Sequence, residues 1–245
     1  MADIRQSAAY AKFIRSIGWR VEKIRGVNVF IRSLGIAKIQ RANVPADFPK
    51  IPGVWLTKLE PLVKQAPKGF RQDGWPLLAS KTQRVDLENI KLKKDARYIL
   101  RKFSNFNFQF LNNFQEFYEI FKKSGKRKRL WVPSYKDYLS LVNSFEKKCF
   151  CVCVNNQAGA LILTHNKIAY YYYAGATAEG TRANLPYLVV WKCMQEAKKR
   201  GCKTWDWEGI YDERWPNKSW KGFTHFKKSF GGYEVEFPGS FTKWF

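Results

Sequence analysis

The chain has 245 residues, enough for one large domain or two small ones, and 45% of them are hydrophobic. This share allows a substantial buried core and excludes a globally disordered chain. The formal net charge of +24 comes from 44 Lys and Arg against 20 Asp and Glu, and it favours a polyanionic partner such as RNA, DNA, a phosphorylated precursor or an anionic membrane face. A generally basic proteome would give the same charge without such a partner, because the excess is spread over the whole chain.

The N-terminal third begins with a predicted helix over residues 7–17, where apolar side chains recur at helical spacing. Two strands are predicted at 27–32 and 36–40, and a shorter strand at 54–56 follows several prolines. A hydrophilic connection that ends near Ser80 is the predicted joint between two parts of the chain.

The remainder of the chain has a more regular pattern of apolar residues. We expect, in chain order, a strand at 84–87, a basic helix at 94–104 and a core-facing helix that starts at Phe114 and is ended by Gly125. A capping box at 134–137 opens a further helix that runs to about 147, and a meander follows over 149–174. A helix at 186–200, opened by a proline, and a closing strand at 204–207 complete the order. This order is typical of an α+β fold in which helices sandwich a sheet.

The cysteines and the absence of long apolar runs indicate the compartment. Cys149, Cys151 and Cys153 share one face of a predicted strand, which is a poor geometry for zinc, so no metal site is predicted. Five cysteines do not form a disulfide framework, and this favours a reducing cytoplasm. The N-terminus lacks the apolar core of a signal peptide, and no apolar run reaches transmembrane length. We expect a soluble cytoplasmic protein that can still touch the inner face of a membrane.

Two blocks near the C-terminus combine charge with aromatic side chains. Residues 205–209 place Asp206 and Glu208 on the same face of a strand that ends at a glycine. Residues 226–232 place Lys227 between aromatic residues and end in a double glycine. A lysine that aromatic rings keep partly dry suits the stabilisation of a developing negative charge better than it suits core packing.

These two blocks belong to a set of four that carries a resemblance to a known family. The set consists of a tyrosine-rich strand at 170–176, a helix with an Ala-Lys ending at 186–201, and the blocks 205–209 and 226–232. In this order and spacing they resemble the Fem family of peptidoglycan bridge-forming aminoacyltransferases (FemA, FemB and FemX types), whose domains have the acyltransferase fold of the GNAT superfamily. Upstream, residues 82–87 with the basic helix resemble the start of the family's second domain, and residues 6–12 resemble the start of its first.

The resemblance implies a GNAT-like α+β fold with a mixed sheet flanked by helices. Residues 81–245 would form a C-terminal acyltransferase domain, and residues 1–80 a truncated N-terminal copy, because they are too few for a complete first domain. The long tRNA-binding helical arm of some family members has no counterpart in the sequence.

The resemblance also implies the transfer of an amino acid from an aminoacyl-tRNA to an amine of a peptidoglycan precursor that is linked to UDP or to a lipid. An aminoacyl ester is already activated, so the reaction needs alignment and oxyanion stabilisation. We expect aminoacyl-tRNA as co-substrate, with no cofactor, no metal and no covalent nucleophile. The donated amino acid, the acceptor amine and the type of precursor stay open.

Site residues follow from the matching positions. Lys227 matches the lysine of the family's Phe-Lys motif and is the candidate catalytic residue, acting on the oxyanion or on a phosphate of the tRNA end, and Phe226 would shape the same pocket. Lys12 matches a lysine that contacts the diphosphate of the precursor, as a point charge can. Arg127 and Arg129 lie where the family has a basic, substrate-facing segment, and the choice between them stays open.

Four further residues complete the set of candidates. Asp206 and Gly209 are candidates for substrate binding, in competition with a structural role at the strand end. Arg97 and Arg101 of the basic helix are the candidates for tRNA binding. The histidine at 225 is interpreted as a surface residue, and no proton acceptor is assigned.

Three alternative functions stay open. An acyl-CoA-dependent N-acyltransferase would use a pyrophosphate-binding loop, and residues 32–37 match its pattern, although they lie in a predicted strand-turn-strand with no helix after it. A non-catalytic RNA-binding module would use the basic charge and stacked aromatic rings. A tRNA-dependent transferase acting on protein N-termini shares fold and donor, and only the segment around Lys12 weighs against it.

Overall fold

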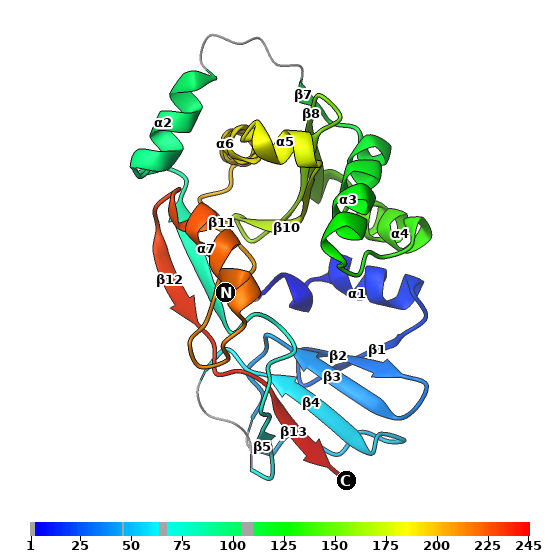
Figure 1. The fold of residues 1–245 in the computed structure, drawn as a ribbon. Coiled ribbons are helices and arrows are strands. Elements are labelled where there is room, and N and C mark those ends of the chain that lie inside the picture. The colour runs from blue at the N-terminus through cyan, green and yellow to red at the C-terminus, as the bar shows by residue number, and fades with distance from the viewer. Residues whose placement is uncertain (1–2, 46, 64–67, 104–109) are drawn as a thin grey trace.

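The computed structural model describes residues 3–45, 47–63, 68–103 and 110–245, in which helices flank two mixed sheets (Figure 1). The helices are η1 (Ile4–Gln6), α1 (Ala8–Ser16), α2 (Lys94–Lys102), α3 (Phe114–Lys128), α4 (Tyr135–Phe145), η2 (Glu146–Lys148), α5 (Ala178–Arg182), α6 (Leu185–Lys199), η3 (Lys218–Trp220) and α7 (Lys221–Lys228). The predicted α+β class is confirmed. The last residue of the predicted basic helix, Ser104, lies outside the described residues.

The first sheet combines strands from both ends of the chain. Its order is β1-β2-β3-β4-β13-β5, in which β3 and β4 pair in parallel and the other neighbours antiparallel. The strands are β1 (Arg20–Ile24), β2 (Val27–Arg32), β3 (Ile36–Gln40), β4 (Leu56–Glu60), β5 (Arg71–Gln72) and β13 (Phe241–Trp244). Because β13 lies between β4 and β5, residues near the C-terminus complete the sheet of the N-terminal third (Figure 1).

The second sheet carries the predicted meander. Its order is β12-β6-β11-β10-β9-β8-β7, with β10 and β11 parallel and the other neighbours antiparallel. The strands are β6 (Lys81–Asp86), β7 (Phe110–Leu111), β8 (Cys149–Val154), β9 (Ala158–His165), β10 (Ile168–Ala176), β11 (Thr204–Asp206) and β12 (Tyr233–Glu236). The prediction that β11 closes the pattern is wrong, because α7, β12 and β13 follow it.

Local sequence signals set several element boundaries as predicted. The hydroxyl of Ser7 accepts a hydrogen bond from the backbone N–H of Tyr10 and caps α1, and the hydroxyl of Ser134 caps α4 in the same way. Pro186 lies in the first turn of α6, where its missing N–H costs nothing. Residues 32–37 span the end of β2, the turn and the start of antiparallel β3, with Gly35 at φ 69°, which confirms the hairpin interpretation.

Two predicted boundaries are wrong for reasons of packing. The helix expected to end at Gly125 continues to Lys128. Gly125 is needed for close approach, because a Cβ there would lie 2.2 Å from Cγ2 of Val132 in the chain that returns along the helix. The strand expected at 54–56 starts at Leu56 instead and continues to Glu60 beside β3.

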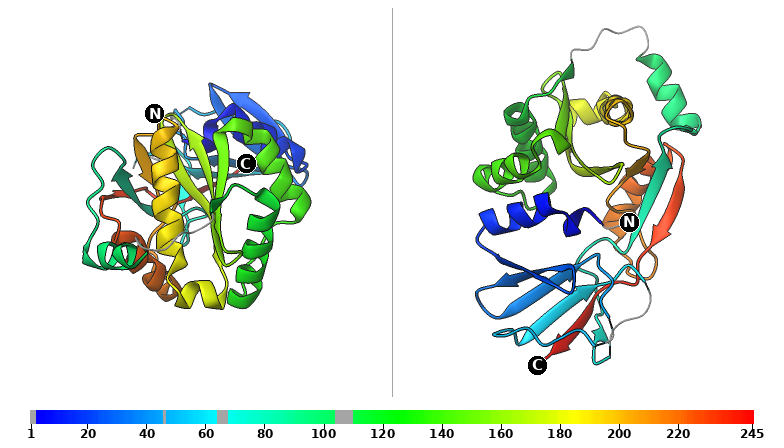
Figure 2. Two further views of the ribbon diagram at one scale, coloured as in Figure 1. Left: turned by 90° about the horizontal axis from the view of Figure 1, so that it is seen from above. Right: turned by 180° about the vertical axis from the view of Figure 1, so that it is seen from behind.

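The meander of the second sheet separates two hydrophobic cores. The cysteines at 149, 151 and 153 face the core formed with α1, α3 and α4, whereas Phe150 and Val152 face the core under α6. In the left panel of Figure 2, α3 and α6 lie on opposite faces of these strands. All five cysteines are buried free thiols. The described part of the chain contains no group of three His, Cys, Asp or Glu side chains placed to hold a metal ion, and none of its helices is long and apolar enough to cross a membrane.

Candidate active site

A cavity of about 570 Å³ opens beside the C-terminal end of β10. Its walls come from β10, the start of α6, the turn after β11 and α7, so it collects the blocks that the sequence singled out (Figure 1). Tyr171, Tyr187, Trp207 and Phe226 supply aromatic walls, and Lys227 supplies a positive charge. A cavity of this size with few polar groups is typical of a site for a small ligand or for the end of a larger one.

Lys227 is held in place by backbone carbonyl groups. Its Nζ donates to the carbonyl oxygen of Trp207 at 2.9 Å and to that of Gly209 at 2.5 Å. It also lies 4.9 Å from the ring centroid of Phe223. Burial lowers the pKa of Lys227 to about 8, although the nearby carboxylates of Glu208 and Asp206 oppose the shift. An ammonium has three donors, and the bonds among the described residues use two, so one remains for a ligand in the cavity.

The aromatic residues around the lysine form a packed cluster. Phe226 contacts Tyr187 edge to face at a centroid distance of 4.8 Å, Trp207 at 5.8 Å and Phe230 at 5.6 Å. Phe226 lines the cavity, where the sequence placed it. These rings exclude water around the ammonium and strengthen its electrostatic effect.

Asp206 lies under the site and shapes the turn beside it. Its carboxylate accepts hydrogen bonds from the Thr82 hydroxyl at 2.7 Å, from Nε of Arg84 at 2.8 Å and from the backbone N–H of Glu208 at 2.9 Å. The cavity lining contains Gly209, whose carbonyl binds Lys227, but not Asp206. These contacts give Asp206 a structural role at the strand end.

The sequence placed Glu208 on one strand face with Asp206 and left open which of the two orients the incoming amine; only Glu208 lines the cavity. It has a left-handed backbone with φ 60°, and its carboxylate forms an ion pair with Arg5 of η1. Arg5 is 203 positions away in sequence, so no local pattern could have indicated the pair.

Of the basic run at the end of α3, the structure brings Lys128 into the cavity wall. Partial desolvation at the wall and the neighbouring charge of Arg127 lower the pKa of Lys128, although the residue as a whole is exposed. Arg127 lies at the rim and donates to the carbonyl oxygen of Ala176 at 3.2 Å, whereas Arg129 caps the helix and is exposed. Sequence analysis missed Lys128 because it ended the helix three residues early, which lost the helical phase that orients this side chain.

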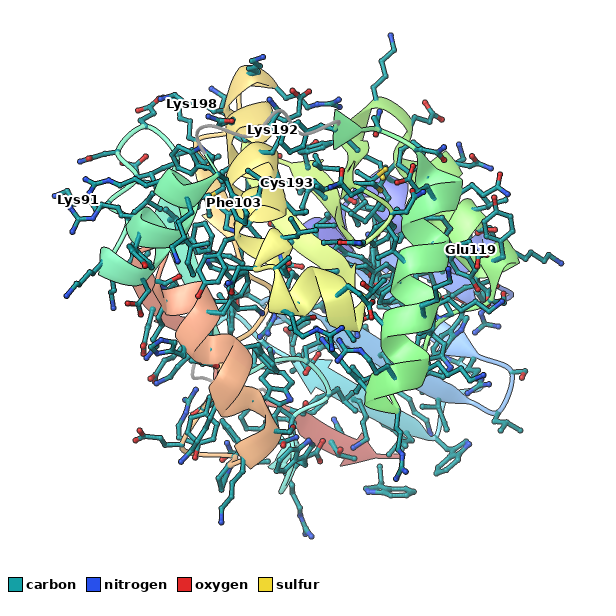
Figure 3. All side chains as sticks on the ribbon, turned by 45° about the horizontal axis from the view of Figure 1, so that its top comes forward. Lys91, Phe103, Glu119, Lys192, Cys193 and Lys198 are labelled. Atoms are coloured by element: carbon teal, nitrogen blue, oxygen red, sulfur yellow. The ribbon has the colours of Figure 1, made fainter. Side chains whose placement is uncertain are left out.

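The other predicted residues lie farther from the cavity. Lys12 is exposed on α1 and pairs with Glu146 at 3.1 Å. Arg97 and Arg101 are exposed on α2. Figure 3 shows further basic side chains on this side of the molecule, with Lys91 just before α2 and Lys192 and Lys198 on α6.

A second hollow lies between this basic side and the cavity. It has a volume of about 390 Å³, lies between α2 and the start of α6, and shares Asn184 and Tyr187 with the main cavity. His225 at the cavity rim is 76% exposed and lies 3.3 Å from Asp95 of α2. The two hollows are therefore neighbours that share a wall at the start of α6.

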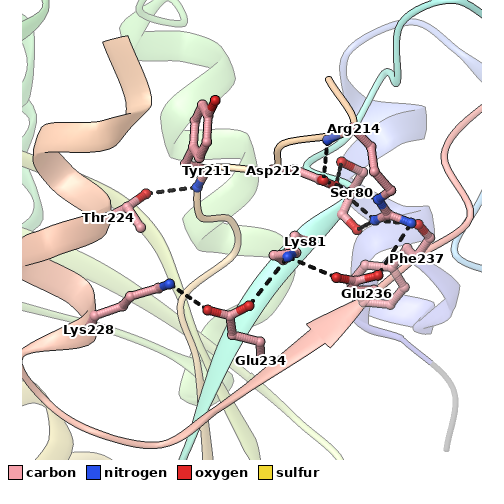
Figure 4. A network of polar contacts seen from close by, with 10 residues as sticks. All are labelled: Ser80, Lys81, Tyr211, Asp212, Arg214, Thr224, Lys228, Glu234, Glu236 and Phe237. Atoms are coloured by element: carbon pink, nitrogen blue, oxygen red, sulfur yellow. Dashed lines mark hydrogen bonds and ion pairs between the residues drawn. The ribbon is translucent and has the colours of Figure 1, made fainter. Parts of the chain in front are cut away.

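A network of polar contacts fixes the segment that joins β11 to α7 (Figure 4). Arg214 binds Asp212 at 2.7 Å and the carbonyl oxygen of Ser80 at 3.1 Å, and the Thr224 hydroxyl accepts from the backbone N–H of Tyr211 at 2.7 Å. Lys228 points away from the cavity and pairs with Glu234 of β12 at 2.5 Å. The network anchors α7 on both sides and thereby sets the position of Lys227.

Comparisons with known proteins connect this geometry to a family. Residues 153–244, which include the cavity turn and α7, match the sequence profile of the FemAB family. No curated protein matches the chain by sequence.

Solved structures share the fold. A structure described as FemX superposes with a TM-score of 0.81 at 13% identity, over 99% of this chain and 92% of that one. The C-terminal domain of a putative lysylphosphatidylglycerol synthetase from Agrobacterium fabrum gives 0.64 at 14% identity, over 98% and 88%. A GCN5-related N-acetyltransferase from Kribbella flavida gives 0.51 at 10% identity, over 99% and 95%. The predicted GNAT-like fold is confirmed, whereas the predicted shortening of the first domain is not, because the chain spans nearly all of the FemX chain. Residues 153–244 are thus similar in sequence to the FemAB family, and the chain as a whole has the fold of the FemX structure.

Proposed function

We propose that this protein transfers an amino acid from an aminoacyl-tRNA to an amine of a peptidoglycan precursor peptide. The observation that carries the proposal is Lys227, whose ammonium is held by two carbonyl groups in an aromatic cavity within the FemAB segment. The family match and the FemX fold support the same reaction class, an acyl transfer.

The geometry suits the chemistry of an activated ester. Attack by an amine turns the ester carbonyl into a tetrahedral oxyanion, and the third donor of Lys227 would stabilise that charge where Phe226 and Trp207 limit water. The reaction as proposed uses aminoacyl-tRNA as co-substrate and needs no further cofactor, because the aminoacyl ester supplies the activation. Because the donor is made in the cytoplasm, we propose a cytoplasmic site of action.

Basic residues would guide both substrates. Arg97 and Arg101 are exposed on α2, and Lys102 of the same helix lines the hollow beside the cavity, so this helix offers basic charge to the acceptor end of a tRNA. Arg127 and Lys128 at the opposite rim would face the diphosphate of a UDP-linked or lipid-linked precursor. Lys12 is a weaker candidate for that contact, because it is exposed and already paired with Glu146.

The test is an incubation of the purified protein with labelled aminoacyl-tRNAs, followed by product mass analysis. Three acceptors are offered in parallel: UDP-linked precursor, lipid-linked precursor and a peptide with a free protein-type N-terminus. Addition of one aminoacyl residue to either precursor supports the proposal. Addition only to the peptide, or acylation of any acceptor only when acyl-CoA replaces the tRNA, would transfer the assignment to one of the alternative transferases.

A further inference from the structure

Glu208 lies between the cavity that holds the Lys227 ammonium and a hollow of about 10 Å³ that it shares with Arg5 and Asp3, and it lines both. Its side chain is 15% exposed, so the carboxylate is largely desolvated yet still reachable. The turn imposes a left-handed backbone at Glu208, with φ 60°, and the N–H of this residue is fixed to Asp206. A non-glycine residue held in this conformation by its surroundings is a recurrent feature of functional sites.

Arg5 binds the Glu208 carboxylate from the side of the N-terminal segment. Its guanidinium also binds Asp3 at 3.0 Å, so one cation serves two carboxylates. Arg5 meets Oε2 of Glu208, and in the bonds of the described residues Oε1 has no partner. The pair therefore orients the Glu208 side chain and leaves one of its oxygens for a ligand.

Lys227 and Glu208 are close enough to interact electrostatically but do not form an ion pair among the described residues. The ammonium is instead tied to the carbonyls of Trp207 and Gly209, on either side of Glu208 in sequence. The cavity thus presents a cation and an anion as two separate groups, an arrangement that suits one group for the oxyanion and the other for a cationic nucleophile.

We propose that Glu208 binds the ammonium of the acceptor and takes its proton, and that Arg5 is the positioning residue that holds the carboxylate for this contact. This inference rests on the proposed function, because it assigns the proton acceptor of the same reaction. The ligand it predicts is a primary amine in its charged form.

One N–H bond of the acceptor ammonium breaks and an O–H bond forms on Glu208, which leaves a neutral amine. Its lone pair forms a C–N bond to the ester carbon, and the carbonyl electrons move to the oxygen near Lys227. Collapse breaks the ester C–O bond, a proton from the nitrogen passes to the departing ribose oxygen, and the proton on Glu208 is lost to solvent. The products are an amide, a free tRNA end and one released proton.

The binding test needs no tRNA and uses n-butylammonium and neutral n-butanol as probes, measured by calorimetry at pH 7 on the full chain. We expect the wild type to prefer butylammonium by about tenfold or more, the scale of one charge-assisted hydrogen bond. Glu208→Gln should abolish the preference. Asp3→Asn is the matched control, because it removes the other carboxylate from Arg5 without touching the main cavity, and it should keep the preference.

Two results would overturn the inference: a wild type without preference for the charged probe, or a Glu208→Gln protein that keeps it. If Glu208→Gln does not fold, as judged by its thermal transition, Glu208→Asp replaces it; the shorter carboxylate should weaken the preference while remaining charged, and an unchanged preference counts against the assignment. The transfer assay separates this inference from the proposed function. If wild type and Glu208→Gln form product at the same rate, the role proposed for Glu208 is wrong and the proposed function stands. If amine binding depends on Glu208 but no product forms, the proposed transfer reaction is wrong and the amine site stands.

Discussion

Replacing Lys227 by alanine tests the role of the ammonium directly. If the third donor of Lys227 faces the oxyanion, Lys227→Ala should lower turnover by about 100- to 1000-fold, the usual effect of losing one such group. The substitution also leaves the carbonyls of Trp207 and Gly209 without this donor, which costs about 1–3 kcal/mol of folding free energy. For a chain of this length that corresponds to a fall in Tm of roughly 2–12 °C.

The assay must therefore separate catalysis from folding. Single-turnover transfer at 25 °C, below the reduced Tm, reports the chemical step, and a thermal scan of the same sample reports stability. Lys228→Ala is the matched control, because Lys228 is the next residue on α7, is 41% exposed and pairs with Glu234 outside the cavity. Its loss should change turnover by no more than about two- to threefold, as for an exposed ion pair. Equally mild effects of both substitutions, with transfer intact, would refute the role given to Lys227.

The remaining predictions concern pH, salt and stability. Burial lowers the pKa of Lys227 to about 8, so its charged form is present below that pH and lost above it. We therefore expect kcat/KM to fall as the pH rises through about 8, and Lys227→Arg should remove this fall. A fall that persists in the arginine variant would belong to another group. Binding of tRNA should weaken steeply as the salt concentration rises. The double variant Arg97→Ala and Arg101→Ala should reduce the slope of log K against log salt concentration by about one to two. An unchanged slope would show that these two arginines do not contact the tRNA. Asp206→Asn should lower the free energy of unfolding, measured in urea, by about 1–3 kcal/mol. This loss is smaller than for a fully buried ion pair, because the Arg84 side chain is 25% exposed. An unchanged free energy of unfolding would contradict the structural role of Asp206.

The sequence predicted those features that depend on neighbouring residues. Ser7, Ser134 and Pro186 set helix starts through contacts within one turn, and the meander follows from the alternation around Cys151. The set of four blocks near the C-terminus likewise predicted that Phe226 and Lys227 share one pocket, and both line the cavity.

Features that depend on distant residues could not be predicted in this way. Gly125 looks like a helix stop, but it is interior because Val132 packs on it, and this error hid Lys128. Nothing near Arg5 in sequence indicates that it meets Glu208, and nothing near β13 indicates that it enters the first sheet between β4 and β5.

The central claim is that this cavity moves an aminoacyl group from tRNA to an amine. The most direct measurement follows a labelled amino acid from purified aminoacyl-tRNA into a peptidoglycan precursor, with the bond type tested by mild alkali, which cleaves esters and spares amides. We predict alkali-stable label on the precursor with the wild type, and roughly one hundredth of that rate with Lys227→Ala. Label that stays on the tRNA with every aminoacyl-tRNA and both precursor types, while the same protein acylates an amine from acyl-CoA, would contradict the account.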